Sequence, residues 1–252
     1  MSKKPSPDLL TPLPTGTFRF RCHRDVPCFT KCCADLRLVL TPYDVLRLKN
    51  RLGLPSPEFL DTYTDTRLEN ASRFPGVFLN MRPDGEKKCP FLTSDGCSVY
   101  EDRPGACRLY PVARASLHTR GGGKEKFFLV QEAHCLGFLE DRKWTVGEWM
   151  KGEGLDEYNT MNDLWLEITS NPRSLGPEKG IPPKVQMYFM ACYNLDRFRD
   201  FLFHSGFFNR FEIDPARRED LASDDVVLLQ FAFQWLKYSL FGEKTLAVKN
   251  DR

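Results

Sequence analysis

The sequence predicts an α+β protein, in which a small antiparallel sheet with cysteine-rich loops is followed by a mostly helical C-terminal half. Three observations support this fold class. Eight of the nine cysteines lie before residue 143, and the same half alternates short apolar stretches with Gly- and Ser-containing turns. After residue 144, long amphipathic stretches at helical spacing dominate. A chain of 252 residues can also bury a substantial core.

The same observations divide the chain into four parts. Residues 1–17 are rich in Pro, Ser and Thr and are expected to be a disordered lead-in. Residues 18–143 form the expected cysteine-cluster domain. Residues 144–243 are expected to form a helical region packed on that domain, and residues 244–252 a tail.

Two helices are predicted directly after the first group of cysteines. In LTPYDVLRLKNRLGL, Thr41 is the expected N-cap, Pro42 the first helical residue and Gly53 the residue that closes the helix. A second helix is predicted from Ser56 to about Asn70.

Short extended stretches follow these helices. GVFLNMR, residues 76–82, is predicted to be a strand. In CPFLTSDGCSVY, a Ser-Asp-Gly turn between short arms predicts a hairpin that brings Cys89 and Cys97 near each other. The stretch PVARASLHTRGGGKEKFFLVQEAHC predicts two strands around the glycines at 121–123. Together these segments suggest a small antiparallel sheet of about three strands.

The C-terminal half is predicted to be helical from its periodicity. TVGEWMKGEGLDEYNTMNDLWLEIT indicates a helix with a break near Gly152 to Gly154. Two further amphipathic helices are expected in KVQMYFMACYNLDRFRDFLFHSG and DDVVLLQFAFQWLKYSLFG. Cys192 falls on the apolar face of the first of these two, with Phe189 and Leu195, so we interpret it as a core residue.

Charge and hydropathy limit the range of partners. Residues 1–143 carry 23 Lys and Arg against 17 Asp and Glu, and residues 144–252 carry 13 against 17. We interpret the basic excess as compensation for thiolates, and a nucleic-acid partner is not expected. The N-terminus lacks an apolar stretch long enough for a signal peptide, and no apolar run approaches the roughly 18 residues of a membrane span, so we expect a cytoplasmic protein without membrane contact.

Three explanations compete for the dense group of cysteines. Disulfides conflict with the expected reducing compartment and with a chain too long to need them. Isolated core cysteines conflict with the charged and polar residues that flank them. Metal ligation by thiolates, which select zinc or iron, is the favoured explanation. The candidate metal ligands are Cys22, Cys28, Cys32, Cys33, Cys89, Cys97, Cys107 and Cys135.

Spacing alone does not identify the metal. Only Cys28-x3-Cys32 fits a zinc knuckle, and the common ferredoxin spacings are absent. Adjacent residues rarely aim both side chains at one ion, so Cys32 and Cys33 are expected to serve two centres or two corners of one cluster. Eight thiolates suit two four-coordinate centres, or one cluster with cysteines left over.

Three stretches resemble one known family. FRFRCHRDVPCFTKCCADLRLVLTPYDVLRL, CPFLTSDGCSVYEDRPGACRLYPVA and HCLGF are similar to the YkgJ-type cysteine-cluster family, a zinc- or iron-chelating domain that includes the flagellin lysine-N-methylase proteins. The resemblance covers residues 18 to about 160, and all eight cysteine positions of the family are filled. It implies a metal site in residues 18–143, which makes this part a cysteine-cluster metal-binding domain, but it implies no particular biochemical role.

Several neighbours of the cysteines have their own interpretations. Where the family more often has Cys-Pro-Gly, this chain has His134 before Cys135, which leaves His134 open as a further ligand or hydrogen-bond partner. Asp102 is predicted to cap a short helix that places Cys107 at its positive end. Two arginines, Arg103 and Arg108, are expected either to hydrogen-bond sulfur or to pair with nearby carboxylates.

The leading hypothesis is a metal-binding protein that holds an iron-sulfur cluster or zinc, with a slight preference for iron because adjacent and redundant thiolates suit clusters. One alternative is a lysine-methylase-like enzyme with a metal site, although no Gly-rich donor-binding loop is visible. Another is a metal-stabilised module for protein interaction. The sequence leaves open whether the protein is an enzyme and which protein partner, if any, it has.

Overall fold

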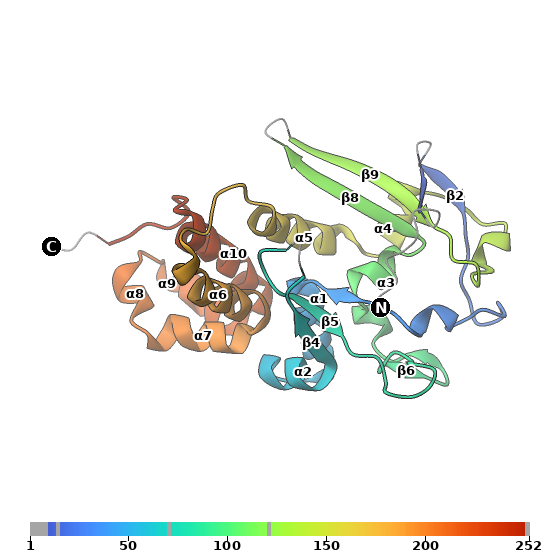
Figure 1. Ribbon diagram of the computed structural model, residues 1–252, viewed down its shortest axis with the longest axis horizontal. Coiled ribbons are helices and arrows are strands. Elements are labelled where there is room, and N and C mark those ends of the chain that lie inside the picture. The colour runs from blue at the N-terminus through green and yellow to red at the C-terminus, as the bar shows by residue number, and fades with distance from the viewer. Residues whose placement is uncertain (1–9, 14–15, 70–71, 120–121, 250–252) are drawn as a thin grey trace. The chain divides into compact units, whose positions relative to one another are not determined.

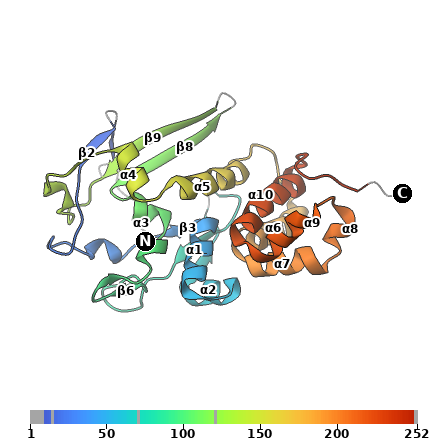
Figure 2. The same ribbon diagram turned by 180° about the vertical axis from the view of Figure 1, so that it is seen from behind.

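The structure is a computed structural model of the 252-residue chain, and it describes residues 10–13, 16–69, 72–119 and 122–249 (Figures 1 and 2). The chain folds into two compact units, each built from two separate stretches of sequence. The first unit combines Met1–Leu38 with Asn80–Thr160, and the second combines Val39–Leu79 with Met161–Arg252. The segment that follows the first cysteine group therefore folds with the C-terminal helices.

The first unit is built on a long antiparallel hairpin (Figure 1, green). Strands β8 (Val112–Thr119) and β9 (Gly122–Val130) pair over their full length, as predicted, with residues 120–121 of the tip outside the described residues. Strand β1 (Leu10–Pro12) adds to β9 and completes a three-stranded sheet in the order β1-β9-β8. This strand lies in the predicted disordered lead-in, of which residues 1–9 and 14–15 lie outside the described residues.

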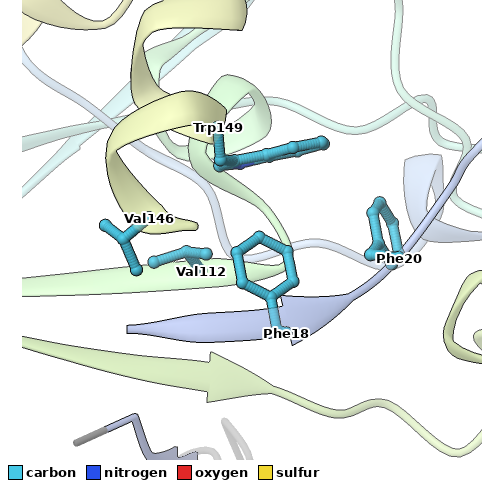
Figure 3. Close-up of a cluster of buried hydrophobic side chains, with 5 residues drawn as sticks. All are labelled: Phe18, Phe20, Val112, Val146 and Trp149. Carbon is cyan, nitrogen blue, oxygen red and sulfur yellow. The ribbon is translucent and has the colours of Figure 1, made fainter. Parts of the chain in front are cut away.

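A cluster of buried side chains forms the core beside this sheet (Figure 3). Strand β2 (Thr17–Arg19) pairs with β10 (Lys143–Thr145), and helix α4 (Val146–Gly152) follows directly. Thr145 and Glu148 form a capping box that starts α4. The core rings meet edge to face, with centroids 5.8 Å apart for Phe18 and Trp149 and 5.6 Å apart for Phe20 and Trp149. The buried residues are Phe18, Phe20, Val112, Val146 and Trp149.

Short elements carry the rest of the first unit. They are the 3-10 helix η2 (Lys31–Cys33), the hairpin of β6 (Leu92–Thr93) and β7 (Gly96–Cys97), the 3-10 helix η3 (Tyr100–Asp102), helix α3 (Gly105–Leu109) and the 3-10 helix η4 (Gly137–Leu139). The β6–β7 hairpin confirms the predicted Ser-Asp-Gly turn, since Leu92 pairs with Cys97.

Helix α1 of the second unit confirms the prediction made from its caps. It spans Pro42–Leu52, Thr41 forms a capping box with Asp44, and Gly53 ends it with a φ of 66°. Helix α2 (Ser56–Tyr63) is shorter than predicted.

The end of α2 is set by strand pairing. Residues Thr64–Arg67 form strand β4 along β5 (Gly76–Leu79), which also pairs with β3 (Val39–Leu40). The backbone groups of β4 find partners on β5 and cannot also continue the helix. Strand β5 likewise ends at Leu79, before the predicted limit at residue 82.

The remainder of the second unit is helical. The predicted helix over residues 184–206 is two helices, α6 (Ile181–Tyr193) and α7 (Leu195–His204), because Asn194 leaves helical geometry and its side chain accepts a hydrogen bond from the Arg197 N–H. Helix α10 (Asp225–Phe241) confirms the prediction for the last amphipathic stretch. Two helices were not predicted: α8 (Phe207–Arg210) and α9 (Pro215–Ser223).

The predicted break near Gly152 to Gly154 is also confirmed. Helix α4 ends at Gly152, Gly154 has a φ of 63°, and helix α5 (Asp156–Thr169) begins after it.

The fold class is the predicted one, with small antiparallel sheets in the N-terminal half and mostly helices in the C-terminal half. Within the described ranges, no helix combines the length and apolar character needed to span a membrane.

Cys192 lies in the core of the second unit, where its side chain is fully buried. Burial raises the pKa of this thiol well above its ordinary value, so the thiol stays neutral. We expect Cys192→Ala to lower the free energy of unfolding by about 1 kcal/mol through lost packing. Metal bound per chain, measured by elemental analysis, should not change. A variant that loses metal while remaining folded would contradict this core assignment.

Candidate metal centre

The eight candidate cysteines all lie in the first unit, on loops and short elements. Cys22 and Cys28 occupy the loop after β2, and Cys32 and Cys33 lie on η2. Cys28 is buried, Cys22 and Cys107 are exposed, and the remaining five are partly buried. The later cysteines are spread over four places. Cys89 lies in the loop before β6, Cys97 on strand β7, Cys107 on helix α3 and Cys135 in the loop after β9. None of these cysteines forms a disulfide in the described structure.

Hydrogen bonds connect the first group of cysteines to the two later ones. The Cys89 N–H donates to the Cys33 carbonyl at 2.7 Å, beside an antiparallel bridge between Ala34 and Lys88. The Leu136 N–H donates to the Cys28 sulfur at 3.1 Å. Segments that are more than 50 residues apart in sequence therefore meet at the cysteines.

The thiols also interact with one another through their charges. Burial is the main cause that raises the pKa of Cys22 to about 11, and the negative forms of Cys32, Cys28 and Cys135 raise it further. For Cys33, a hydrogen bond with Cys32 raises the pKa most, followed by burial and by the charges of Cys32, Cys89 and Cys107. These effects disfavour several thiolates in this space at once, unless a bound cation offsets their charge.

Besides the Leu136 N–H at Cys28, backbone N–H groups are directed at three further sulfurs and favour their anionic form. Burial raises the pKa of each of these thiols and is the largest cause in each case, while the N–H group of the residue two positions later lowers it. Hydrogen bonds of this kind stabilise thiolate ligands in metal and iron-sulfur sites. The pairs are Phe91 with Cys89, Val99 with Cys97 and Gly137 with Cys135.

The Tyr110 hydroxyl is a buried polar group without a hydrogen-bond partner of normal geometry among the described residues. Burial raises the pKa of Tyr110, and the adjacent Cys135 thiol raises it further, so the hydroxyl stays protonated and available as a donor. Buried polar groups normally have partners. A thiolate at Cys135, as metal binding requires, would supply an acceptor for this proton, and the donor set therefore fits a metal. The sequence placed Tyr110 in a family motif, but no role could be assigned to it.

Arg103 and Arg108 are both buried, and they hold α3 in place through oxygen acceptors. Arg108 donates to the carbonyls of Glu101, Arg103 and, at 2.7 Å, Glu153. Arg103 donates to the Tyr100 carbonyl at 2.6 Å and forms an ion pair with the Glu153 carboxylate. Glu153 was not predicted, since it is 46 residues beyond Cys107 and carries no motif.

The predicted cap of α3 is wrong. Pro104 occupies the N-cap position of this helix and no side chain caps it, because Asp102 belongs to the preceding η3.

His134 contacts Glu132, with 3.4 Å between Nε2 and the carboxylate oxygen. His23 lies between two carboxylates, 3.3 Å from Glu140 and 3.5 Å from Asp25. These contacts give both histidines oxygen partners.

In the part of the chain that the structure describes, no three His, Cys, Asp or Glu side chains are grouped tightly enough to hold a metal ion. The cysteines are neighbours whose sulfurs interact, but they do not converge on one point. The assignment of all eight as ligands stays a prediction.

The first unit is a thiol-rich domain in which hydrogen bonds join the first cysteine segment to the two later ones. Residues 21–136 match the family model described as "Putative zinc- or iron-chelating domain", which confirms the resemblance and includes all eight cysteines. Over these residues, the chain carries a domain of the cysteine-cluster, zinc- or iron-chelating family. Neither the curated proteins nor the solved structures contain a match.

Gly137 allows the loop after Cys135 to approach the first cysteine segment. A Cβ atom at this position would lie 2.7 Å from the Phe20 ring and 2.9 Å from the Arg21 carbonyl oxygen. We expect Gly137→Ala to lower the free energy of unfolding by about 1–3 kcal/mol, because the buried ring and the backbone must both move. Chemical denaturation would measure the change.

Gly147→Ala is the matched control. A Cβ atom on Gly147, in helix α4, meets no atom within 4 Å, so the change should stay within about 0.5 kcal/mol. Equal effects of the two substitutions would contradict the close approach at Gly137.

Proposed function

We propose that the protein binds iron, as an iron-sulfur cluster, or zinc through the eight cysteines of its first unit. The observation that carries this proposal is the hydrogen bond from the Leu136 N–H to the Cys28 sulfur, which brings the third cysteine segment to the first. The mutual effects of the thiols on their pKa values are consistent with it, because a bound cation would offset the repulsion among several thiolates. The adjacent Cys32 and Cys33 and the number of thiolates favour iron over zinc.

Residues of this chain would hold and tune the metal. When bound, a cluster supplies one-electron chemistry, whereas zinc supplies a structural cross-link. The backbone N–H groups of Phe91, Val99 and Gly137 would donate to ligand sulfurs, and the Tyr110 hydroxyl would donate to Cys135. The metal would organise residues 18–143, and a reducing compartment such as the cytoplasm would keep the thiols available.

Protein purified without oxygen tests the proposal. We expect a brown protein with iron and acid-labile sulfide, measured by elemental analysis, sulfide assay and visible absorption. Stoichiometric zinc without iron or visible absorption would reject the preference for iron and keep the metal site. Protein that holds neither metal after purification, and takes up neither after incubation with iron and sulfide or with Zn²⁺, would reject the proposed function.

A further inference from the structure

Helix α6 of the second unit is apolar on more of its surface than the core uses. Its sequence, IPPKVQMYFMACY, contains one charged residue, Lys184, and one amide, Gln186. A surface helix normally presents polar residues on the side that faces away from the core. On α6, apolar side chains that include Val185, Phe189 and Met190 are only partly buried. The residues of α6 that are fully packed into the core are Tyr188, Ala191, Cys192 and Tyr193.

The partly buried side chains of α6 line a groove of about 770 Å³ that is open to solvent. Every lining residue belongs to the second unit, so the groove lies within one compact body. A volume of roughly 300–1,000 Å³, mostly apolar walls and a few polar groups are typical of sites for small ligands. Six of the ten lining residues are apolar: Pro75, Pro183, Val185, Met187, Phe189 and Met190.

The groove follows α6 along its axis. The lining residues run from Pro183 in the first turn to Asn194 just after the last, eleven positions later. At a rise of 1.5 Å per residue this is a length of about 16 Å. Two of the walls are methionines, Met187 and Met190, whose unbranched side chains adapt to the shape of an apolar partner. The groove therefore suits a long and narrow apolar molecule.

Arg197 supplies the only charge among the residues that line the groove. It is exposed, and its backbone N–H donates to the Asn194 side chain at 3.2 Å, which fixes its place in the first turn of α7. Within the described ranges its guanidinium has no hydrogen-bond or ion-pair partner. A guanidinium matches a carboxylate through two parallel hydrogen bonds. One unpaired cation beside apolar walls is complementary to an apolar molecule with a single negative charge.

We propose that the groove along α6 binds an unbranched aliphatic carboxylate. The alkyl chain contacts Val185, Phe189 and Met190, and the carboxylate accepts hydrogen bonds from Arg197. A single cation matches a carboxylate better than the double charge of a phosphate ester. None of the candidate metal ligands lines this groove, so the inference goes beyond the proposed metal binding and does not rest on it.

The probe is decanoate, titrated into the full-length chain below the concentration at which it forms micelles and followed by isothermal titration calorimetry. We expect saturable binding of one molecule per chain. Decan-1-ol, which has the same chain length without the charge, should bind about five- to tenfold more weakly because the hydrogen bonds to a charged partner are weakened. No saturable binding of decanoate, or equal affinities for the two compounds, would overturn the inference.

The variant Arg197→Gln should weaken decanoate binding about five- to tenfold and change the affinity for decan-1-ol by less than about twofold. Arg210→Gln is the matched control, because Arg210 is also an exposed arginine of the second unit but does not line the groove. Decanoate should bind this control as it binds the unmodified chain. Equal losses in the two variants would mean that Arg197 makes no specific contact, and would overturn the inference.

Hydrogen exchange on the unmodified chain provides a readout that does not depend on the folding of variants. Saturating decanoate should slow exchange in residues 181–197, which include α6 and the first turn of α7. Slower exchange elsewhere, with these residues unchanged, would overturn the placement of the site. A short amphipathic helical peptide with an acidic end that protects residues 181–197 when decanoate does not would assign the groove to a protein partner, and would also overturn the inference.

Discussion

Replacing either Cys33 or Cys107 with alanine is expected to lower the amount of bound metal and to loosen the whole first unit. The two cysteines are 74 positions apart in the sequence, and they lie on η2 and α3, which are too short to be stable alone. Closing a loop of this length costs entropy, and structural metal binding can offset that cost by several kcal/mol. Loss of one ligand therefore acts far beyond its own loop.

Hydrogen exchange on the metal-loaded chain and on the two variants measures this effect. We expect protection to fall by about tenfold or more across the described residues of both Met1–Leu38 and Asn80–Thr160. The second unit has its own core, including Cys192 and the buried faces of α6, α7 and α10, so it should change less. Full metal content and unchanged exchange in both variants would mean that Cys33 and Cys107 are not ligands.

Replacing Arg108 with leucine is expected to lower the free energy of unfolding by about 3 kcal/mol or more. The Arg108 guanidinium donates to three backbone carbonyls, of Glu101, Arg103 and Glu153, and it lies over the Tyr158 ring at 4.9 Å. Leucine keeps the apolar contact and leaves the three carbonyls without these donors. Because these hydrogen bonds hold α3 in place, Cys107 on this helix should also become less well positioned.

Denaturation of the metal-free and metal-loaded forms measures both consequences. Metal affinity should fall together with stability, since Cys107 would have to be repositioned on binding. Arg142→Leu is the matched control: Arg142 also lies over an aromatic ring, Trp144 at 4.0 Å, but it is exposed, so the change should be within about 0.5 kcal/mol. Equal effects of the two substitutions would show that the carbonyl contacts of Arg108 add little.

The elements that the sequence predicted well are those with local causes. Thr41, Pro42 and Gly53 define helix α1 because caps act within one turn of the helix. The break between α4 and α5 follows from Gly154, whose positive φ is unfavourable for other residues. The fold class follows from the same kind of information, since turns and apolar periodicity are local properties of the chain.

Elements with distant partners were predicted less well. Helix α2 stops at Tyr63 because the next four residues pair with β5, where even the nearest paired residues, Arg67 and Gly76, are nine positions apart. Leu10–Pro12 is a strand only because β9 offers its edge. The division into units has the same origin, since residues 39–79 fold with helices that come more than 80 residues later. In each case the partner, and not the segment's own composition, sets the structure.

For the candidate site, the sequence by itself determined the donor atoms: eight thiols in one stretch of the chain, their family resemblance and their preference for zinc or iron. The tertiary structure alone decided which thiols are neighbours. Cys28 lies beside the residue after Cys135, and Cys33 lies beside Cys89, because backbone N–H groups of the later segments donate to the first one. Such hydrogen bonds depend on loop closure over more than 50 residues, and no local pattern in the sequence encodes them.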